Sequence, residues 1–208
     1  MKNKVVLSNK TYQKTTFIVL LIIILFVGLF IYYASNYNST IVPTPPQSFA
    51  VSREKLSNTS KEIDNLNQQL AQKIVEIQNA DKLNNKQLAL SLIQDAKNIN
   101  QQIKNKNNDL KSELQTLQNS LNNFSNPTTM QTISNAINLK KEFLEEFENY
   151  TNLMNEFFSS LSVSISSPTK QNKEKIANLI QVINEKINTI NNLNKNFNST
   201  LNQIQTIK

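Results

Sequence analysis

Few residues of this chain could carry chemistry, and one small group of acidic side chains is the first candidate. Four glutamates gather between positions 142 and 148, namely Glu142, Glu145, Glu146 and Glu148. Paired carboxylates can act as general acid and base or can bind divalent cations. On a helix, however, Glu142, Glu145 and Glu146 would lie opposite or beside the apolar face that carries Phe143 and Phe147, with lysines next to them. We therefore interpret the cluster as a solvated helix face.

The other common catalytic groups are missing from the sequence. The chain has no histidine, no cysteine and a single glycine, Gly28. These absences exclude thiol nucleophiles, disulfides, imidazole bases, the usual zinc ligands and glycine-rich phosphate loops. We therefore predict no catalytic, cofactor-binding or metal-binding residues, and we expect a protein that is not an enzyme and has no cofactor.

The formal net charge of +7 raises the question of nucleic-acid binding, so its distribution along the chain matters. Four lysines lie before residue 15, and the remaining eighteen basic residues exceed the fifteen acidic residues by three. A nucleic-acid surface would show arginine clusters or aromatic residues along a basic stripe. Arg53 is the one arginine, and the lysines alternate with acids. We expect no nucleic-acid partner.

Residues 15–34 form an uncharged apolar run, TTFIVLLIIILFVGLFIYYA. About 20 such residues are needed for a helix to cross the roughly 30 Å hydrocarbon core of a bilayer. A buried helix of a soluble protein would show a polar stripe, and this run has none. The sequence therefore predicts a transmembrane anchor, with the lipid bilayer as its partner.

Charges on the two sides of this run predict its direction. Lysines but no acids precede it, while residues 35–52 have no charge. The positive-inside rule then places residues 1–14, a basic tail, in the cytoplasm and the bulk of the chain outside a cell membrane. A cleaved signal peptide is the alternative. The length of the apolar run, and Tyr32 where a signal peptidase expects a small residue before Ala34, favour an uncleaved single-pass signal anchor.

Residues 35–52 predict an extracytoplasmic linker, because they lack a helical period and contain three prolines. Residues 53–208 predict a helical domain with four helices, at 53–79, 85–123, 127–160 and 169–207. Ser52 is the predicted N-cap of the first helix, Asn126 and Pro127 mark the start of the third, and Ser167 and Pro168 mark the start of the fourth. Because glycine is so scarce, we expect asparagine at helix ends and turns.

Two local irregularities interrupt the helical periods. In the second helix the apolar pattern skips near Lys106 and Asn107, which predicts a local shift of phase. Residues 160–166, SLSVSIS, alternate with a period of two. Since no other segment offers this stretch a partner strand, we predict an extended connection there.

The last two predicted helices have the strongest apolar patterns. The third carries an aromatic stripe that predicts core packing, or otherwise an exposed partner-binding strip. The fourth has strict seven-residue spacing through Ile176, Ile183, Ile190, Phe197 and Ile204, and Asn194 is the polar residue in the flanking series with Ile180, Ile187 and Leu201. Because the connections are short, successive helices should be antiparallel. The predicted fold class is all-α, a long antiparallel helical bundle, with an open coiled coil completed by oligomerisation as the alternative.

An anchored helical bundle without catalytic motifs fits two classes of function. The first is a membrane-anchored extracytoplasmic scaffold or interaction protein of the cell envelope, whose partner is another envelope or surface protein or a second copy of itself. The alternative is an outward-facing adhesin or ligand-binding helical bundle. In both classes the helical domain acts by presenting a surface.

The predicted orientation can be tested with single cysteines, because the chain has none of its own. A cysteine at Ser112 should react with a membrane-impermeant thiol reagent in intact or wall-stripped cells. A cysteine at Ser8 should react only after the membrane is permeabilised. The reverse labelling pattern would overturn the predicted orientation.

Overall fold

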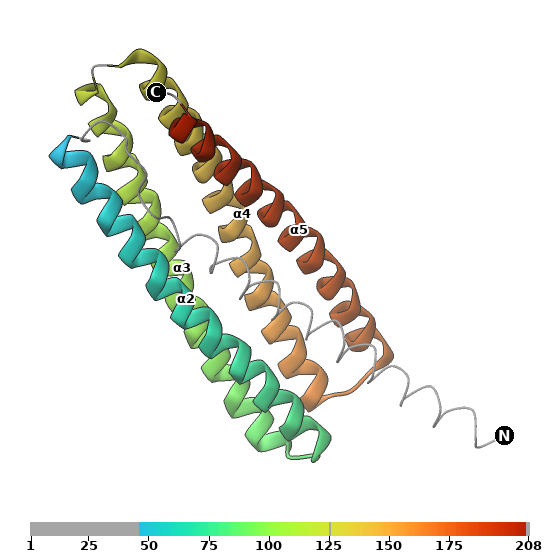
Figure 1. Cartoon of the computed structure of the whole chain (residues 1–208). Helices are drawn as coiled ribbons and strands as arrows, with labels where there is room; N and C mark the ends of the chain where they lie inside the picture. The colour runs from blue at the N-terminus through green and yellow to red at the C-terminus, as the bar shows by residue number, and fades with distance from the viewer. Residues whose placement is uncertain (1–45, 125, 207–208) are drawn as a thin grey trace.

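The computed structural model describes residues 46–124 and 126–206, with side chains described as far as residue 200. Within these residues the protein is all-α, with four long helices, one short 3-10 helix and no strand (Figure 1). The helices are α2 (Gln47–Lys82), α3 (Lys86–Asn119), η1 (Ser120–Asn123), α4 (Pro127–Ser166) and α5 (Lys170–Thr206). The predicted four helices and their order are confirmed. The predicted anchor and most of the predicted linker lie outside the described residues.

The first helix begins earlier than predicted. α2 starts at Gln47, directly after Pro46, and Ser52 is buried within the helix instead of capping it. Phe49, in the first turn, packs edge to face on Phe124, with the ring centroids 5.0 Å apart. The prediction of a start at residue 53 is wrong. The first turn of α2 has no apolar period that the sequence could reveal, and it is stabilised by this contact with Phe124, a residue far along the chain.

An asparagine pair makes the turn between α2 and α3. Asn84 has a φ of 55°, in the left-handed region that asparagine tolerates better than most residues. Asn85 is the N-cap of α3, and its side-chain oxygen accepts a hydrogen bond from the N–H of Leu88 at 3.2 Å. The expected break between residues 79 and 85, and the expected use of asparagine there, are both confirmed.

The start of α4 follows the predicted cap. The Asn126 side chain accepts hydrogen bonds from the N–H groups of Thr128 and Thr129, at 3.0 and 3.1 Å. Pro127 occupies the first turn, where its missing N–H costs no helical hydrogen bond. At the preceding boundary, the last residues of the predicted second helix form the 3-10 helix η1 instead of an α-helical turn.

The other end of α4 differs from the prediction. Residues 160–166 continue the helix to Ser166, so the predicted extended connection is wrong. Ser160 and Ser164, four residues apart, are both buried, as a helical face requires. The Ser166 hydroxyl donates to the carbonyl of Ser162, as serine does within helices. Thr169, not Ser167, caps α5, because its Oγ1 accepts from the N–H of Asn172.

Consecutive helices are antiparallel and pack side by side (Figure 1). Among the described residues, the close backbone contacts between the long helices join α2 with α3, α3 with α4 and α4 with α5. The helices thus form two hairpins, α2–α3 and α4–α5, joined through α3 and α4. One hydrophobic core cluster takes side chains from all four helices. The predicted helical bundle is therefore confirmed for this part of the chain.

Replacing Ile183 and Ile190 with Asp should largely unfold the helical domain. Both side chains are buried, with 1% and 6% of their surface exposed. Burying each contributes about 1.5–3 kcal/mol, and a buried carboxylate without a partner adds a further cost. Domains of this size are stable by about 5–15 kcal/mol, so the double variant should lose most of its helical circular dichroism below the parent's melting temperature.

Asn188→Asp is the matched control, since it adds the same charge at an exposed position of α5. It should change the free energy of unfolding by about 0.5 kcal/mol or less. Lys186 is unsuitable as a control because it binds Glu146 of α4. If the double isoleucine variant melts within a couple of degrees of the parent, α5 is not packed as described.

Candidate functional site

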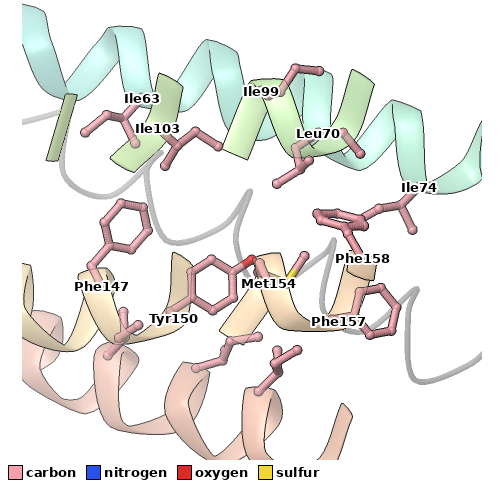
Figure 2. Close-up of a cluster of buried hydrophobic side chains, with 14 of the residues drawn as sticks. Ile63, Leu70, Ile74, Ile99, Ile103, Phe147, Tyr150, Met154, Phe157 and Phe158 are labelled. Atoms are coloured by element: carbon pink, nitrogen blue, oxygen red, sulfur yellow. The ribbon is translucent and has the colours of Figure 1, made fainter. Parts of the chain in front are cut away.

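The aromatic residues of α4 face the interior. Phe143, Phe147, Tyr150, Phe157 and Phe158 are each 6% exposed or less. Neighbouring rings stack along the helix, with centroids 6.0 Å apart for Phe143 and Phe147 and 5.8 Å apart for Phe147 and Tyr150. Figure 2 shows Phe147 and Phe158 projecting toward side chains of α2 and α3. The core interpretation of this stripe is confirmed, and the alternative of an exposed strip is wrong.

Tyr150 is the one titratable group in this aromatic row. Burial raises the pKa of its phenol above the usual value of 10. The hydroxyl therefore stays protonated at neutral pH, and it is a poor candidate for a general base.

The glutamates of α4 do not act as one group. Glu142 and Glu145 are exposed, as predicted. Glu146 and Glu148 are half-buried, so the prediction of a solvated face is wrong for them: Glu146 binds Lys186 of α5, and Glu148 binds Lys111 of α3. The hydrogen bond from Lys111 and its charge lower the pKa of Glu148. Within the described residues, no group of three or more acidic side chains could hold a metal ion.

Two buried amides connect α3 to α4. Asn100 Nδ2 donates to the carbonyl of Thr151 at 2.8 Å, and Asn107 Nδ2 donates to the carbonyl of Leu144 at 3.0 Å. Both asparagines are fully buried. Since donors and acceptors are each seven residues apart, a one-turn slide of α3 along α4 would break both hydrogen bonds. The amides therefore fix the register between the two hairpins.

The position of Asn107 corrects the predicted phase shift in the second helix. Buried positions keep three- and four-residue steps through Ile103, Asn107 and Leu110, and α3 is continuous. Position 107 carries a polar side chain in place of an apolar one. The apolar pattern of the sequence is therefore interrupted there, while the periodic burial of α3 continues. The same steps from Ala96 to Asn100 to Ile103 could have identified Asn100 from the sequence. Asn194 is likewise buried on the seam of α5.

A charged pair also lies between the hairpins. Asp64 of α2 and Lys140 of α4 interact electrostatically, and the Oδ1 atom of Asp64 is shielded from solvent without a hydrogen-bond partner. Lys140 Nζ lies 4.2 Å from the ring centroid of Phe143 and 5.5 Å from that of Phe197. Neither residue was predicted from the sequence to belong to a site. Lys140 was detectable, because it follows Ile137 by three residues and precedes Leu144 by four.

Exposed large apolar side chains of the described residues occur on all four long helices and at the turn after α2. They are Val51 and Val75 on α2, Leu83 at the following turn, Leu88 on α3, Val163 on α4 and Val182 on α5. Isolated exposed apolar residues are normal on protein surfaces and do not indicate a binding patch by themselves. The buried polar groups between the hairpins are therefore the candidate functional site.

Comparison with known proteins found no match among protein-family models, curated proteins or solved structures. Among residues 46–124 and 126–206, no helix is long and apolar enough to cross a membrane. Residues 15–34, the predicted anchor, lie outside this range.

Replacing the register-fixing amides with leucine should raise stability and reduce specificity. Asn100 and Asn107 each leave a buried Oδ1 without a partner, which costs about 1–3 kcal/mol. Asn107→Leu should therefore raise the melting temperature. The double variant, Asn100→Leu with Asn107→Leu, should also give more than one set of amide NMR signals, because α3 could pack on α4 in more than one register.

Asn108→Leu makes the same change at an exposed position of α3 and should leave both measurements near those of the parent. A lower melting temperature for Asn107→Leu would show that the bond to Leu144 outweighs the unpaired oxygen. A single set of signals from the double variant would show that the amides do not determine the register.

Proposed function

We propose that this protein is a membrane-anchored, non-catalytic scaffold of the cell envelope whose helical bundle lies outside the cytoplasm. The observation that carries the proposal is the combination, in one chain, of the uncharged run at residues 15–34 and a bundle that begins at Gln47. A run of that length and composition is typical of a transmembrane helix. The lysines before it orient the bundle outward.

The bundle is suited to present a surface at a distance from a membrane. Its long helices have 34 to 40 residues, and an α-helix rises about 1.5 Å per residue. In this proposal the anchor precedes α2, so the start of α2 is the end of the bundle nearest the membrane. The turn between α2 and α3 lies at the opposite end, about 50 Å from the start of α2. Ion pairs between helices, such as Glu62 with Lys106 and Glu156 with Lys175, are placed along its sides.

The chemistry of the interior supports a binding role over a catalytic one. The buried polar side chains are asparagines, serines and threonines; Asp64 and Lys140 are half-buried, and the glutamates of α4 are exposed or bound by lysines. None of these is arranged as a nucleophile with an adjacent base, which covalent catalysis needs. A protein partner, or a second copy of this chain, is the expected ligand of the surface.

Site-specific photocrosslinking in living cells tests the scaffold proposal. A photoreactive residue is placed at one exposed position on each helix, Gln68, Asn108, Asn149 and Asn188, and at buried Ile183 as the control. A scaffold with a defined binding face should give one recurrent crosslinked product, with the same envelope protein or with itself, from one or two adjacent helices. Equal products from all four helices, or products from the Ile183 position alone, would contradict the proposal.

A further inference from the structure

We propose that Asp64 and Lys140 form a latch between the two hairpins, and that at this latch the α2–α3 hairpin separates reversibly from the α4–α5 hairpin while each hairpin stays folded. The proposal goes beyond the scaffold function and does not depend on it. It starts from an unusual placement: Asp64 of α2 has a shielded carboxylate oxygen without a hydrogen-bond partner, and its charge interacts with that of Lys140 on α4, a helix that does not follow α2 in the chain.

The close backbone contacts between the long helices follow the order of the chain. In the described residues α2 contacts α3, α3 contacts α4 and α4 contacts α5, so the two hairpins meet through α3 and α4. Polar side-chain bonds occur within the hairpins, as from Thr59 to Glu113, and also across the α3–α4 contact, where Lys111 binds Glu148. Because α2 and α5 lie at the two ends of this order, the hairpins are the natural units that would separate.

The interface between the hairpins also holds polar atoms that water would satisfy. Asn100 and Asn107 face α4 and each leave Oδ1 unpaired, as does Asp64. A buried polar atom without a partner costs free energy that is recovered when the atom is hydrated. Opening at this interface exposes apolar side chains and breaks the two amide hydrogen bonds, but it hydrates these atoms, which offsets part of the cost of opening.

The two charges make this opening depend on pH. Burial raises the pKa of Asp64 from 3.8 to about 7, and the charge of Lys140 partly offsets the rise. Burial lowers the pKa of Lys140 from 10.5 to about 8, and the charge of Asp64 partly offsets that change. In an open form both groups are hydrated and regain pKa values near their usual ones.

The direction of the effect follows from proton binding. As the pH falls below about 7, the closed form takes up a proton at Asp64 that the open form does not bind until much lower pH, so closing is favoured. As the pH rises above about 8, the closed form releases the proton of Lys140 while the open form keeps it, so closing is again favoured. Opening is therefore most frequent between about pH 7 and 8, where the closed form holds both charges partly shielded from solvent.

The other charged groups of the neighbouring helices are bonded to partners other than Asp64 and Lys140 or are exposed, and some of these bonds cross the α3–α4 contact. On α3, Lys106 binds Glu62 and Asp109, Lys111 binds Glu148, Lys104 donates to Asn152, and Glu113 accepts from Thr59. On α4, Lys141 donates to Gln118. On α5, Lys186 binds Glu146, Glu185 accepts from Gln181, and Lys195 is exposed. The pKa of Glu148 is lowered from its usual 4.5 and that of Lys106 is raised from its usual 10.5, so their contributions to stability are lost only below the first value and above the second.

Opening would uncover the aromatic row of α4 on the side that faces α2 and α3. Phe147 and Phe158 project toward those helices in the closed form (Figure 2). Their exposure would present an apolar surface that the closed bundle hides, and aromatic side chains are enriched in the energetically important part of protein interfaces. The latch therefore gives the bundle a hidden binding face that is released without unfolding.

Thiol labelling of the full-length chain in detergent tests the latch. Thr151→Cys places a nearly isosteric thiol at a fully buried position of α4 whose carbonyl binds Asn100, so it reports separation of the hairpins. Thr59→Cys reports opening within the α2–α3 hairpin, since Thr59 binds Glu113. Labelling rates between about pH 5.5 and 9.5 are divided by the rate of the exposed thiol of Ser112→Cys at the same pH, which removes the titration of the thiol itself.

The corrected rate at Thr151→Cys should be severalfold higher near pH 7.5 than at either end of this range, and the rate at Thr59→Cys should stay low and nearly constant. Adding Asp64→Asn should remove the change below pH 7, and adding Lys140→Gln should remove the change above pH 8. Asp81→Asn, which removes an exposed carboxylate of α2, should keep the parent profile.

Three results would overturn the latch: a corrected rate at Thr151→Cys that does not vary with pH, the same profile at both reporters, or a profile unchanged by Asp64→Asn and Lys140→Gln. The second result would mean that the whole domain unfolds together. None of these results bears on whether the bundle is a scaffold, because the labelling measures opening and not partner binding.

Discussion

The contact between α3 and α4 holds the two hairpins of this bundle in one arrangement. Each hairpin has its own seam of isoleucine and leucine side chains, and apolar seams of this kind tolerate sliding by one turn at modest cost. The amides of Asn100 and Asn107 do not tolerate such sliding, because each donates a hydrogen bond to a particular carbonyl of α4. These two hydrogen bonds therefore favour one relative position of the hairpins, and with it one arrangement of the side chains on the outer surface.

This way of fixing register has a cost in stability. Each amide leaves one buried oxygen unpaired, and the carboxylate of Asp64 adds another. Apolar residues at the same positions would bury more hydrocarbon and leave no unsatisfied atom, but they would permit several registers of similar energy. A protein whose proposed role is to present a defined surface needs one register more than it needs maximal stability.

The same polar groups set where the bundle is weakest. The ion pairs Glu62–Lys106 and Glu156–Lys175 connect helices within a hairpin, and are partly exposed, so each contributes little to stability by itself. Burial of the apolar side chains contributes most of the stability of each hairpin. Between the hairpins, the aromatic row of α4 is accompanied by the two amides of α3, by the ion pair Lys111–Glu148 and by a lysine that lies over Phe143. Rigid hairpins joined by a mixed polar and apolar interface are the physical basis for motion between them.

Local sequence signals determined much of this fold. Apolar residues at three- and four-residue steps identified four helices, and Asn126 with Pro127 identified the start of α4 because the cap and the missing N–H act within one turn. The scarcity of glycine predicted asparagine at turns, as Asn84 shows. Tertiary contacts decided the rest. The first turn of α2 is supported by Phe49 on Phe124, and residues 160–166 are helical because α4 can bury Ser160 and Ser164 on one face. The candidate site depends even more on the tertiary structure. The helical phase of the sequence places Asn107 and Lys140 on the inward faces of their helices. The packing of α4 against its neighbours then brings Asp64 near Lys140 and a carbonyl to each amide.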